Sequence, residues 1–435
     1  MNKNTVLSLP QVTVDYTFMV PNHIETICGE FVNREFFPEQ VRVVLDNISK
    51  LGLKQDHNIR LDNDDSRSSQ DLGGALQYLR DKYPDTELAQ VGGNPAIAAL
   101  RGHYLGVRDR DPSLPIVRYA GIYTASLAEF IEKQKVQAPA FYRMLEQVFD
   151  KTLCFQVDDK PMTLALEGHY KIIFAYGPGR TLDCITSSGN FSDYLRRLTP
   201  TVPRTPGRKV LFAFPSVPYP LELAAQLLDQ IQTNFGEQAL IFVGCSSFRD
   251  GSTPDFERTM RTWELILKRA HILSMNETEL GDLHTVVVGK GTHQDKPLSY
   301  KLLELPIEAI KVCHGADGSL MDPGPDPGRV INAAQFVNDP AAFLQESLRL
   351  ATDGATYGIA SPSGHDATEA GVRIFSATVP NRNTERFRAT FLNVLESMPP
   401  GLIAVHTPVV ARSMSALTGV GARFDGLLVT FLMRS

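Results

Sequence analysis

The sequence predicts an α/β fold in which a mostly parallel sheet is covered by helices on both faces, with a smaller β-rich lid. The first observation is an alternation that begins near residue 209, where strand-like runs such as "KVLFAFP" and "QALIFVGC" are each followed by a segment of helical spacing. Long strand-helix alternation forms parallel sheets that helices bury on both sides. The second observation is a stretch between Ile116 and Pro206, where short strand-like runs follow one another across turns without long helices between them. That pattern is typical of a small β-rich lid.

At 435 residues the chain exceeds the size of a usual single core. This length predicts two domains, or one large domain with an insertion. The changes of character along the chain assign residues 1–20, 71–115 and 207–435 to a large discontinuous α/β domain, and residues 21–70 and 116–206 to the lid region.

The composition excludes several classes of protein. A net charge of −6 and a pI of about 6.0 argue against nucleic acid or an acidic membrane as the main partner. The 5 cysteines are scattered, without a C-x-x-C pair, which predicts reduced thiols and no structural zinc. No run approaches the roughly 20 apolar residues of a membrane span, and the N-terminal segment lacks the apolar core of a signal peptide. We therefore expect a soluble cytoplasmic protein, whose oligomeric state the sequence leaves open.

The first elements follow from local patterns. The segment Val12 to Val20 alternates and is rich in β-branched residues, which predicts the first strand. Helical spacing appears in Val41 to Ser49 and again in Leu72 to Tyr83, and the polar segment Leu61 to Gln70 between them is expected to be a loop.

A glycine pair marks the next candidate site. Gly92 and Gly93 lie between a short strand and a helix expected over Pro95 to Leu105, and Asn94 stands at the start of that helix. Two glycines let the backbone approach a ligand, and the Asn94 amide can cap the helix or bind a hydroxyl group. A plain strand-helix turn explains the same residues, and both interpretations stay open at this point.

Asn276 and Glu279 follow the strand-like run "HILSM". Ligands of open parallel sheets collect at the carboxyl ends of the strands, where an N-x-x-E element suits a hydrated Mg²⁺ and a phosphate tail. The alternative is an N-terminal capping box, since an Asn followed three residues later by Glu caps a helix. We favour the metal interpretation. The run "KVCHGADGSL" further along predicts a structural hairpin.

The C-terminal segment holds a second glycine turn. Gly419 and Gly421 precede an apolar stretch, Phe424 to Met433, that predicts a closing helix. A glycine turn that opens a helix presents unpaired backbone N–H groups and the positive end of the helix dipole, which suits a phosphate group. No Walker loop, G-x-S-x-G or dinucleotide G-x-G-x-x-G occurs, so the sequence favours neither a hydrolase nor a dehydrogenase.

Together these elements resemble the ribokinase superfamily, and most closely its ADP-dependent branch of phosphofructokinases and glucokinases. Four segments carry the resemblance in the family's order, and they are "VGGNPAIAALRGHYLG", "YKIIFAYGPG…SSGNFSDY", "ILSMNETEL" and "HTPVVARSMSALTGVGARFDG". The resemblance implies a large nucleotide-binding domain and a lid that together enclose a sugar or sugar phosphate and ADP or another nucleotide. It further implies Mg²⁺-assisted phosphoryl transfer to a sugar hydroxyl, as in glycolysis and carbohydrate metabolism.

The same resemblance assigns roles to residues of this chain. Gly92, Gly93 and Asn94 would line the sugar site, Asn276 and Glu279 would serve the metal, and Gly419 and Gly421 would form the anion hole. These seven positions are carried over from the family's motifs.

At one position the chain departs from the family pattern, because Ala422 stands where the catalytic aspartate is expected. Alanine accepts no proton, and general-base catalysis typically contributes about 10²–10⁴-fold. Asp425 lies three residues further on, and we do not expect it to replace the base. Two hypotheses follow, a sugar kinase with impaired catalysis and a pseudokinase that binds sugar and nucleotide without turnover. A structural subunit that has lost both sites is a third and weaker interpretation.

Overall fold

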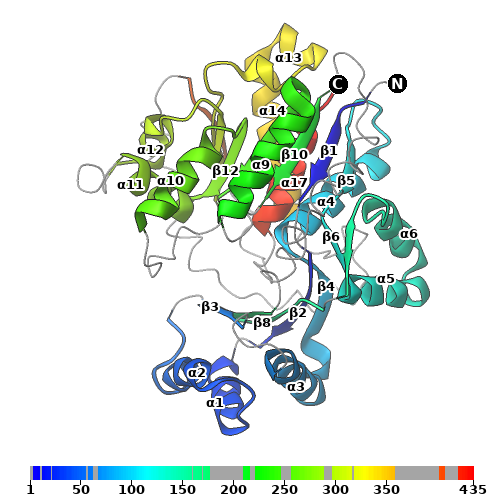
Figure 1. Cartoon of the computed structure of the whole chain (residues 1–435), viewed down its shortest axis with the longest axis vertical. Helices are drawn as coiled ribbons and strands as arrows, with labels where there is room; N and C mark the ends of the chain where they lie inside the picture. The colour runs from blue at the N-terminus through cyan, green and yellow to red at the C-terminus, as the bar shows by residue number, and fades with distance from the viewer. Residues whose placement is uncertain are drawn as a thin grey trace.

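The computed structural model describes most of the chain, and the account below is confined to that part. The described residues are 3–9, 12–20, 22–54, 57–61, 67–158, 160–168, 170–176, 209–215, 221–245, 256–288, 296–315, 318–357, 401–406 and 420–435. They form a large sheet with helices on both faces and a smaller sheet below it, which carries helices on its far side (Figure 1).

The large sheet has eight strands in the order β15-β14-β13-β12-β11-β10-β1-β5. All neighbours from β13 to β5 are parallel, whereas β14 and β15 add to one edge in antiparallel fashion. The strands are β1 Thr5–Ser8, β5 Ile116–Tyr119, β10 Val210–Phe214, β11 Ala239–Gly244, β12 Ile272–Asn276, β13 Ile310–His314, β14 Gly318–Asp322 and β15 Ile403–His406. The sequence pattern predicted this mostly parallel sheet, and β13 and β14 form the expected hairpin.

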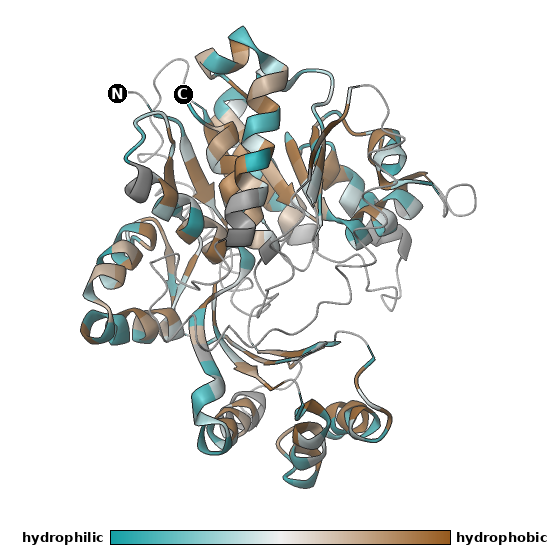
Figure 2. Cartoon of the chain, turned by 180° about the vertical axis from the view of Figure 1, so that it is seen from behind, coloured by the Kyte–Doolittle hydropathy of each residue, from teal (hydrophilic) through white to brown (hydrophobic). Residues whose placement is uncertain are grey.

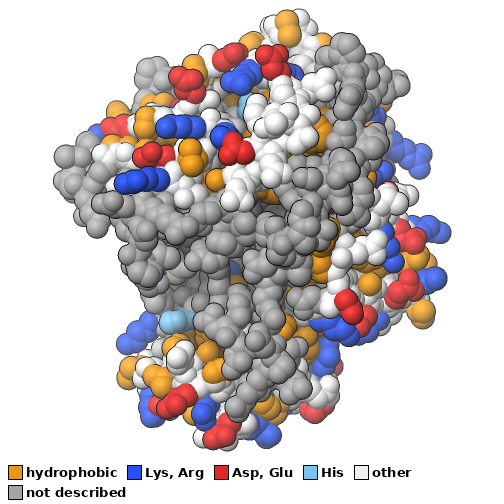
Figure 3. Space-filling model, in the orientation of Figure 1, with side chains coloured by type: hydrophobic (Ala, Val, Ile, Leu, Met, Phe, Trp, Pro, Cys, Tyr) orange, Lys and Arg blue, Asp and Glu red, His pale blue; other side chains and the backbone are white. Residues whose placement is uncertain are grey.

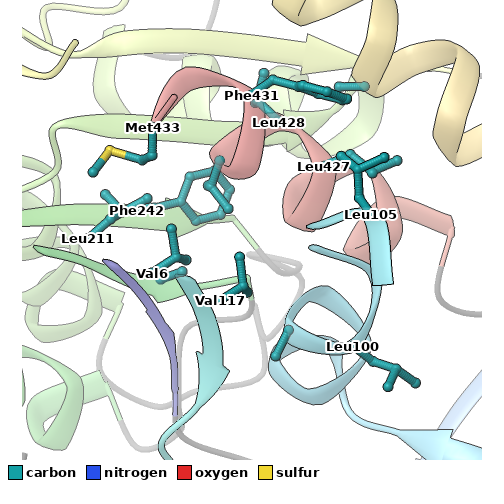
Figure 4. Packing of buried hydrophobic residues seen from close by; sticks show 14 of the residues in the cluster. Val6, Leu100, Leu105, Val117, Leu211, Phe242, Leu427, Leu428, Phe431 and Met433 are labelled. Carbon is teal, nitrogen blue, oxygen red and sulfur yellow. The ribbon is translucent and has the colours of Figure 1, made fainter. Parts of the chain in front are cut away.

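Alternate residues of the central strands supply two separate cores, one on each face of the sheet. Leu211 and Phe242 point into one core, while their neighbours Phe212 and Ile241 point into the other. The first core is covered by α4 Asn94–Asp109, α14 Pro340–Tyr357 and α17 Val420–Leu432, and the second by α9 Leu221–Phe235, α10 Phe256–Leu267, α11 Glu277–Val288 and α12 Leu298–Glu304. Figures 1 and 2 show the two helix layers from opposite sides, and Figure 4 shows the side chains of the first core.

The smaller sheet, which we call the lid sheet, has the strand order β3-β9-β8-β2-β4. Its strands are β2 Thr13–Met19, β3 His57–Arg60, β4 Glu87–Gly92, β8 Met162–Glu167 and β9 Lys171–Tyr176. One face packs its apolar residues against α1 Ile24–Asn33, α2 Glu39–Leu51 and α3 Arg67–Lys82. The opposite face is turned toward the large domain (Figure 1).

Smaller elements complete the described part. They are α5 Ala125–Gln137, α6 Pro139–Val148, α13 Ala334–Asn338, the two-stranded pair of β6 Ile122–Thr124 and β7 Phe155–Val157, and the 3₁₀ turns Pro84–Thr86, Gly236–Gln238 and Pro327–Arg329. Helices α5 and α6 pack their apolar residues into the first core of the large domain. Within the described residues, no helix is both long enough and apolar enough to cross a membrane.

The two sheets do not divide at the boundaries that the sequence suggested. Strands β2 and β4, placed in the large domain by sequence, belong to the lid sheet, whereas β5 belongs to the large sheet. The stretch 116–206 also contains two helices, α5 and α6, before its strands begin. The alternation of β2 identified a strand correctly but not its partner, because pairing with β8 joins residues such as Val14 and Met162 that are far apart in sequence.

Candidate functional site

Helices α4 and α17 lie against each other so closely that glycine is needed at the contact. A Cβ atom at Gly426 would lie 2.3 Å from the carbonyl oxygen of Ala98, and one at Gly102 would lie 2.5 Å from Oγ1 of Thr430. Ala98 and Gly102 are one turn apart, as are Gly426 and Thr430, so the two helices run in the same direction. Their N-termini therefore open at the same end of the molecule.

The same register brings the two glycine turns together. One turn before Ala98 and Gly426 lie Asn94 and Ala422, so the start of α4 stands level with the start of α17. Both helices direct the positive ends of their dipoles to this end. We call the space in front of the two N-termini the shared mouth. The sequence had singled out both turns, and their meeting is what the fold adds.

At the α4 side of the mouth, the backbone is shaped by the glycine pair. Gly93 has a φ of 80° and is the N-cap, and no side chain caps the helix there, so Asn94 does not act as a cap. Oγ of Ser8, at the end of β1, donates a hydrogen bond of 2.6 Å to the carbonyl of Pro95 and ties the helix start to the large sheet. Uncapped N–H groups at a helix start suit an anion or a polar ligand.

Position 92 must be glycine because the carboxylate of Asp15 fills the space where a side chain would lie. The sequence alone did not indicate this aspartate. A Cβ atom at Gly92 would lie 1.8 Å from Oδ1 of Asp15, so the Asp15 side chain occupies the space beside the glycine. Thr13 Oγ1 donates a hydrogen bond of 2.7 Å to the same oxygen. The pKa of Asp15 is raised from 3.8 to about 6, chiefly by burial and to a smaller extent by the nearby Glu167, against hydrogen bonds from Thr13 and Thr163 that lower it. A buried carboxylate with a perturbed pKa beside a glycine turn is a candidate site residue.

Asp15 belongs to a polar face of the lid sheet. Thr13, Asp15 and Thr17 of β2 pair with or lie near Thr163 and Glu167 of β8, whereas Phe18 of β2 and Leu164 and Leu166 of β8 point into the apolar core against α1 to α3. All five polar side chains are buried. Oγ1 of Thr17 has no hydrogen-bond partner within the described residues. A buried face rich in hydroxyl and carboxylate groups can bind the hydroxyl groups of a sugar. The signal in the sequence was an aspartate in the middle of an otherwise apolar, β-branched strand.

At the α17 side of the mouth, Gly421 and Ala422 stand in the first turn of the helix. A Cβ atom at Gly421 would lie 3.2 Å from Cε1 of His314, at the end of β13. Burial lowers the pKa of His314 to about 4, so this imidazole is neutral near pH 7. Ala422 is buried and offers no group that exchanges protons. Gly419 lies outside the described residues, and so does most of the loop that leads to the helix.

Asp425, one turn further into α17, is buried and held by the sheet. Oγ of Ser274 in β12 donates a hydrogen bond of 2.6 Å to Oδ1 of Asp425. Burial raises the pKa of Asp425 well above its ordinary value, the Ser274 hydrogen bond opposes this, and Glu279 adds to the rise. The contact of Asp425 with Ser274 also anchors α17 beside the carboxyl end of β12.

At that strand end, Asn276 and Glu279 hold each other's backbone. The Asn276 N–H donates to Oε2 of Glu279 at 2.8 Å, and the Glu279 N–H donates to Oδ1 of Asn276 at 2.9 Å. This reciprocal pair is the capping box that the sequence left as the alternative, at the start of α11. No cluster of three or more potential ligand residues exists among the described residues. Mg²⁺ commonly needs only one or two carboxylates besides phosphates and water, so the geometry leaves the metal role of this pair as a prediction.

On the side of the molecule seen in Figure 3, acidic and basic side chains of the described residues are interspersed. The described cysteines, Cys28, Cys154, Cys245 and Cys313, are all buried and free.

No protein-family model matches the chain, and no curated protein matches it by sequence. Solved structures do match. A phosphofructokinase from Pyrococcus horikoshii OT3 with AMP is similar at a TM-score of 0.53 and 13% identity, covering 99% of this chain and 98% of the other. A hypothetical ADP-dependent phosphofructokinase from the same organism is similar at a TM-score of 0.53 and 13% identity. That match covers 99% of this chain and 98% of the other.

A third match is the last common ancestor of ADP-dependent phosphofructokinases from Methanosarcinales, with a TM-score of 0.53 and 12% identity over 99% of this chain and 94% of that one. The chain therefore has the ribokinase-like fold of these phosphofructokinases over nearly its whole length. This confirms the fold that the sequence resemblance implied.

Proposed function

We propose that this protein is a sugar kinase of the ADP-dependent type, with impaired catalysis, that binds a sugar or sugar phosphate and a nucleotide at the shared mouth of α4 and α17. The observation that carries the proposal is the parallel packing of these two helices. It points two glycine turns at one space, beside a polar face of the lid sheet that holds Asp15. The likeness to ADP-dependent phosphofructokinases, one of them with AMP, supports ADP as the phosphoryl donor.

In this proposal the residues at the shared mouth have different roles in binding the sugar, the phosphoryl group and the metal. Asp15 and the Asn94 amide orient the sugar hydroxyl groups, and the Gly92–Gly93 backbone lets the sugar approach the start of α4. The backbone N–H groups at Gly419 and Gly421 stabilise the negative charge that develops on the phosphoryl group. A bound Mg²⁺, held on the side of Asn276 and Glu279, would neutralise charge on the phosphates. Such positioning and charge stabilisation make up most of phosphoryl-transfer catalysis.

The impairment follows from the missing base. Ala422 stands in the first turn of α17 and cannot take the proton of the attacking hydroxyl. Asp425 does not substitute for it, because its carboxyl group is buried and accepts a hydrogen bond from Ser274. We therefore expect turnover about 10²–10⁴-fold below that of a kinase with a carboxylate base. The same two residues favour the second candidate, a pseudokinase that binds sugar and nucleotide without turnover.

The test is to restore the carboxylate and measure binding and turnover separately. With Mg²⁺ and ADP, phosphorylation of glucose and of fructose 6-phosphate should be slow or absent in the natural protein. It should rise by about 10²–10⁴-fold in Ala422→Asp if only the base is missing. Calorimetry should give similar affinities for ADP in both forms, because Ala422 makes no contribution to binding.

The control is Asp425→Asn, which keeps the shape of the side chain. It should leave any residual turnover unchanged. Ordinary kinase turnover in the natural protein that disappears in Asp425→Asn would overturn the impaired-base proposal. Ligand binding with no turnover even in Ala422→Asp would favour the pseudokinase. A protein that binds neither ADP nor any sugar would refute both. With such ligands the protein would serve carbohydrate metabolism in the cytoplasm.

A further inference from the structure

A buried arginine at the shared mouth has no role in the proposal above. Arg423 is only 5% exposed, and its Nη1 atom has no hydrogen-bond partner within the described residues. A guanidinium group carries five N–H donors and stays charged near pH 7. A buried N–H donor of a charged group is unfavourable when it lacks an acceptor. The structure therefore holds a cation at a position that an anion would stabilise.

The direction of the side chain follows from the helix. Arg423 lies on the same face of α17 as Gly426 and Thr430, three and seven residues further on. Those two residues contact α4, so Arg423 leaves α17 on the side of α4. Side chains on a helix lean toward its N-terminus, which directs the guanidinium group to the shared mouth.

The electrostatic surroundings agree with this placement. The pKa of Arg423 is lowered to about 10, chiefly by burial and also by Arg101 of α4, while Glu167 of the lid sheet opposes this shift. The group thus lies within the electrostatic reach of both the helix α4 and the polar face of the lid. Arg101 adds a second positive charge to the same region, and the dipoles of α4 and α17 add their positive ends.

We propose that Arg423 binds a phosphate oxyanion at the shared mouth of α4 and α17. The ligand class is a phosphate ester or anhydride, either the phosphate of a sugar phosphate or the terminal phosphate of the nucleotide. The fork of the guanidinium group matches two phosphate oxygens, and the backbone N–H groups of the helix starts supply further donors.

The choice of organic ligands rests on the proposed function, but binding of inorganic phosphate does not. The experiment therefore measures dissociation constants for inorganic phosphate, ADP, fructose 6-phosphate and glucose by calorimetry. It compares the natural protein with Arg423→Gln and Arg423→Lys. The matched control is Arg329→Gln, which removes an exposed guanidinium near His271, at the opposite end of β12.

Arg423→Gln should weaken the binding of inorganic phosphate by about 10–100-fold. It should weaken the binding of ADP, of fructose 6-phosphate, or of both by a similar factor. The affinity for glucose should not change. The organic ligand that loses affinity identifies the source of the phosphate. The melting temperature without ligand should not fall, because an unpaired buried charge has been removed. Arg423→Lys keeps the charge but loses the fork, and should lose several-fold in phosphate affinity. Arg329→Gln should change none of these values.

Two results would overturn the proposal. One is unchanged phosphate binding in Arg423→Gln, and the other is an equal loss for glucose and for the phosphate ligands. If Arg423→Gln does not fold, Arg423→Lys decides, and phosphate binding equal to that of the natural protein refutes the proposal. If the natural protein binds inorganic phosphate through Arg423 but neither ADP nor sugars, the proposed function fails while this inference stands. If ADP and sugar bind and Arg423 has no influence, the inference fails alone.

Discussion

The starts of α4 and α17 make the most instructive comparison in this molecule. They lie level with each other, follow glycine turns and point at the same space. Around the start of α4 the side-chain chemistry is rich, with Asp15 against Gly92 and a polar lid face beside it. At the start of α17 the position expected to hold the base is Ala422, and the next carboxylate, Asp425, is buried and bound to Ser274.

The difference teaches that a ligand cradle and its catalytic group depend on different parts of the chain. The cradle is backbone geometry held by helix packing, and it persists when a side chain changes. A general base is a single side chain, and its loss leaves the packing of α17 intact. A protein of this kind can therefore retain binding after it loses turnover. The predictions below test each side of this comparison.

The largest effect on stability is expected from a substitution at the contact between α4 and α17, which keeps the starts of the two helices level. Gly426→Ala would place a methyl group 2.3 Å from the Ala98 carbonyl oxygen, which is backbone and cannot move aside. We expect the free energy of unfolding, measured in urea, to fall by about 2–3 kcal/mol. Binding of both sugar and nucleotide should weaken, because separating α4 from α17 disturbs both starts at once.

The matched control for that change is Gly106→Ala, also in α4. Its added Cβ would meet nothing within 4 Å, so the free energy of unfolding should rise by about 0.4–1 kcal/mol. Equal effects of the two substitutions would contradict the view that close packing of α4 on α17 sets the shared mouth.

A smaller effect is expected on the α4 side alone. Asp15→Asn removes the negative charge, and affinity for glucose or fructose 6-phosphate should fall by about 10–100-fold at pH 7.5, since hydrogen bonds to a charged acceptor are the strong ones. In the natural protein, sugar affinity should increase as the pH rises through about 6, where Asp15 ionises. This pH dependence should vanish in Asp15→Asn. Sugar binding that is equally pH-dependent in the variant would show that another group titrates.

The raised pKa of Asp15 also predicts the direction in which the free energy of unfolding changes with pH. The pKa of Asp15 is raised from its ordinary 3.8 to about 6, so the folded protein binds more protons than the unfolded chain between these values. The free energy of unfolding without ligand should therefore fall as the pH rises from about 4 to about 6. Asp15→Asn should reduce this slope and be more stable than the natural protein at pH 7.5 by about 1–2 kcal/mol. Urea unfolding over this pH range measures both.

Local patterns predicted the large sheet and its helices because those elements repeat a simple period over many residues. They also located the glycine turn before α4, since a turn with a positive φ, as at Gly93, favours glycine whatever the tertiary structure. Each of these features depends on a short stretch of chain. The sequence could therefore indicate the two halves of the candidate site before their meeting was known.

What local patterns could not supply was long-range placement. Asp15 lies beside Gly92 only because β2 pairs with β4 in the lid sheet, and Arg423 lies near α4 only because α17 packs on that helix. A buried charge in either element reads as an isolated polar residue when the partners are unknown. The pair Asn276 and Glu279 shows a different difficulty. The same motif suits a helix capping box and a Mg²⁺ site, and the sequence alone cannot separate these two roles.

The smallest effect is expected for substitutions of Glu279, which distinguish the capping role from the Mg²⁺ role. Glu279→Gln keeps the capping box, because glutamine also accepts from the Asn276 N–H, but it removes the carboxylate charge. Glu279→Ala removes both, and should lower the free energy of unfolding by about 1 kcal/mol, whereas Glu279→Gln should stay within a few tenths. If the residue also serves Mg²⁺, both variants should weaken Mg²⁺-dependent ADP binding to a similar extent. If the pair is a cap alone, ADP binding with Mg²⁺ should be the same in Glu279→Gln and the natural protein, which would restrict the ligand chemistry to the shared mouth of α4 and α17.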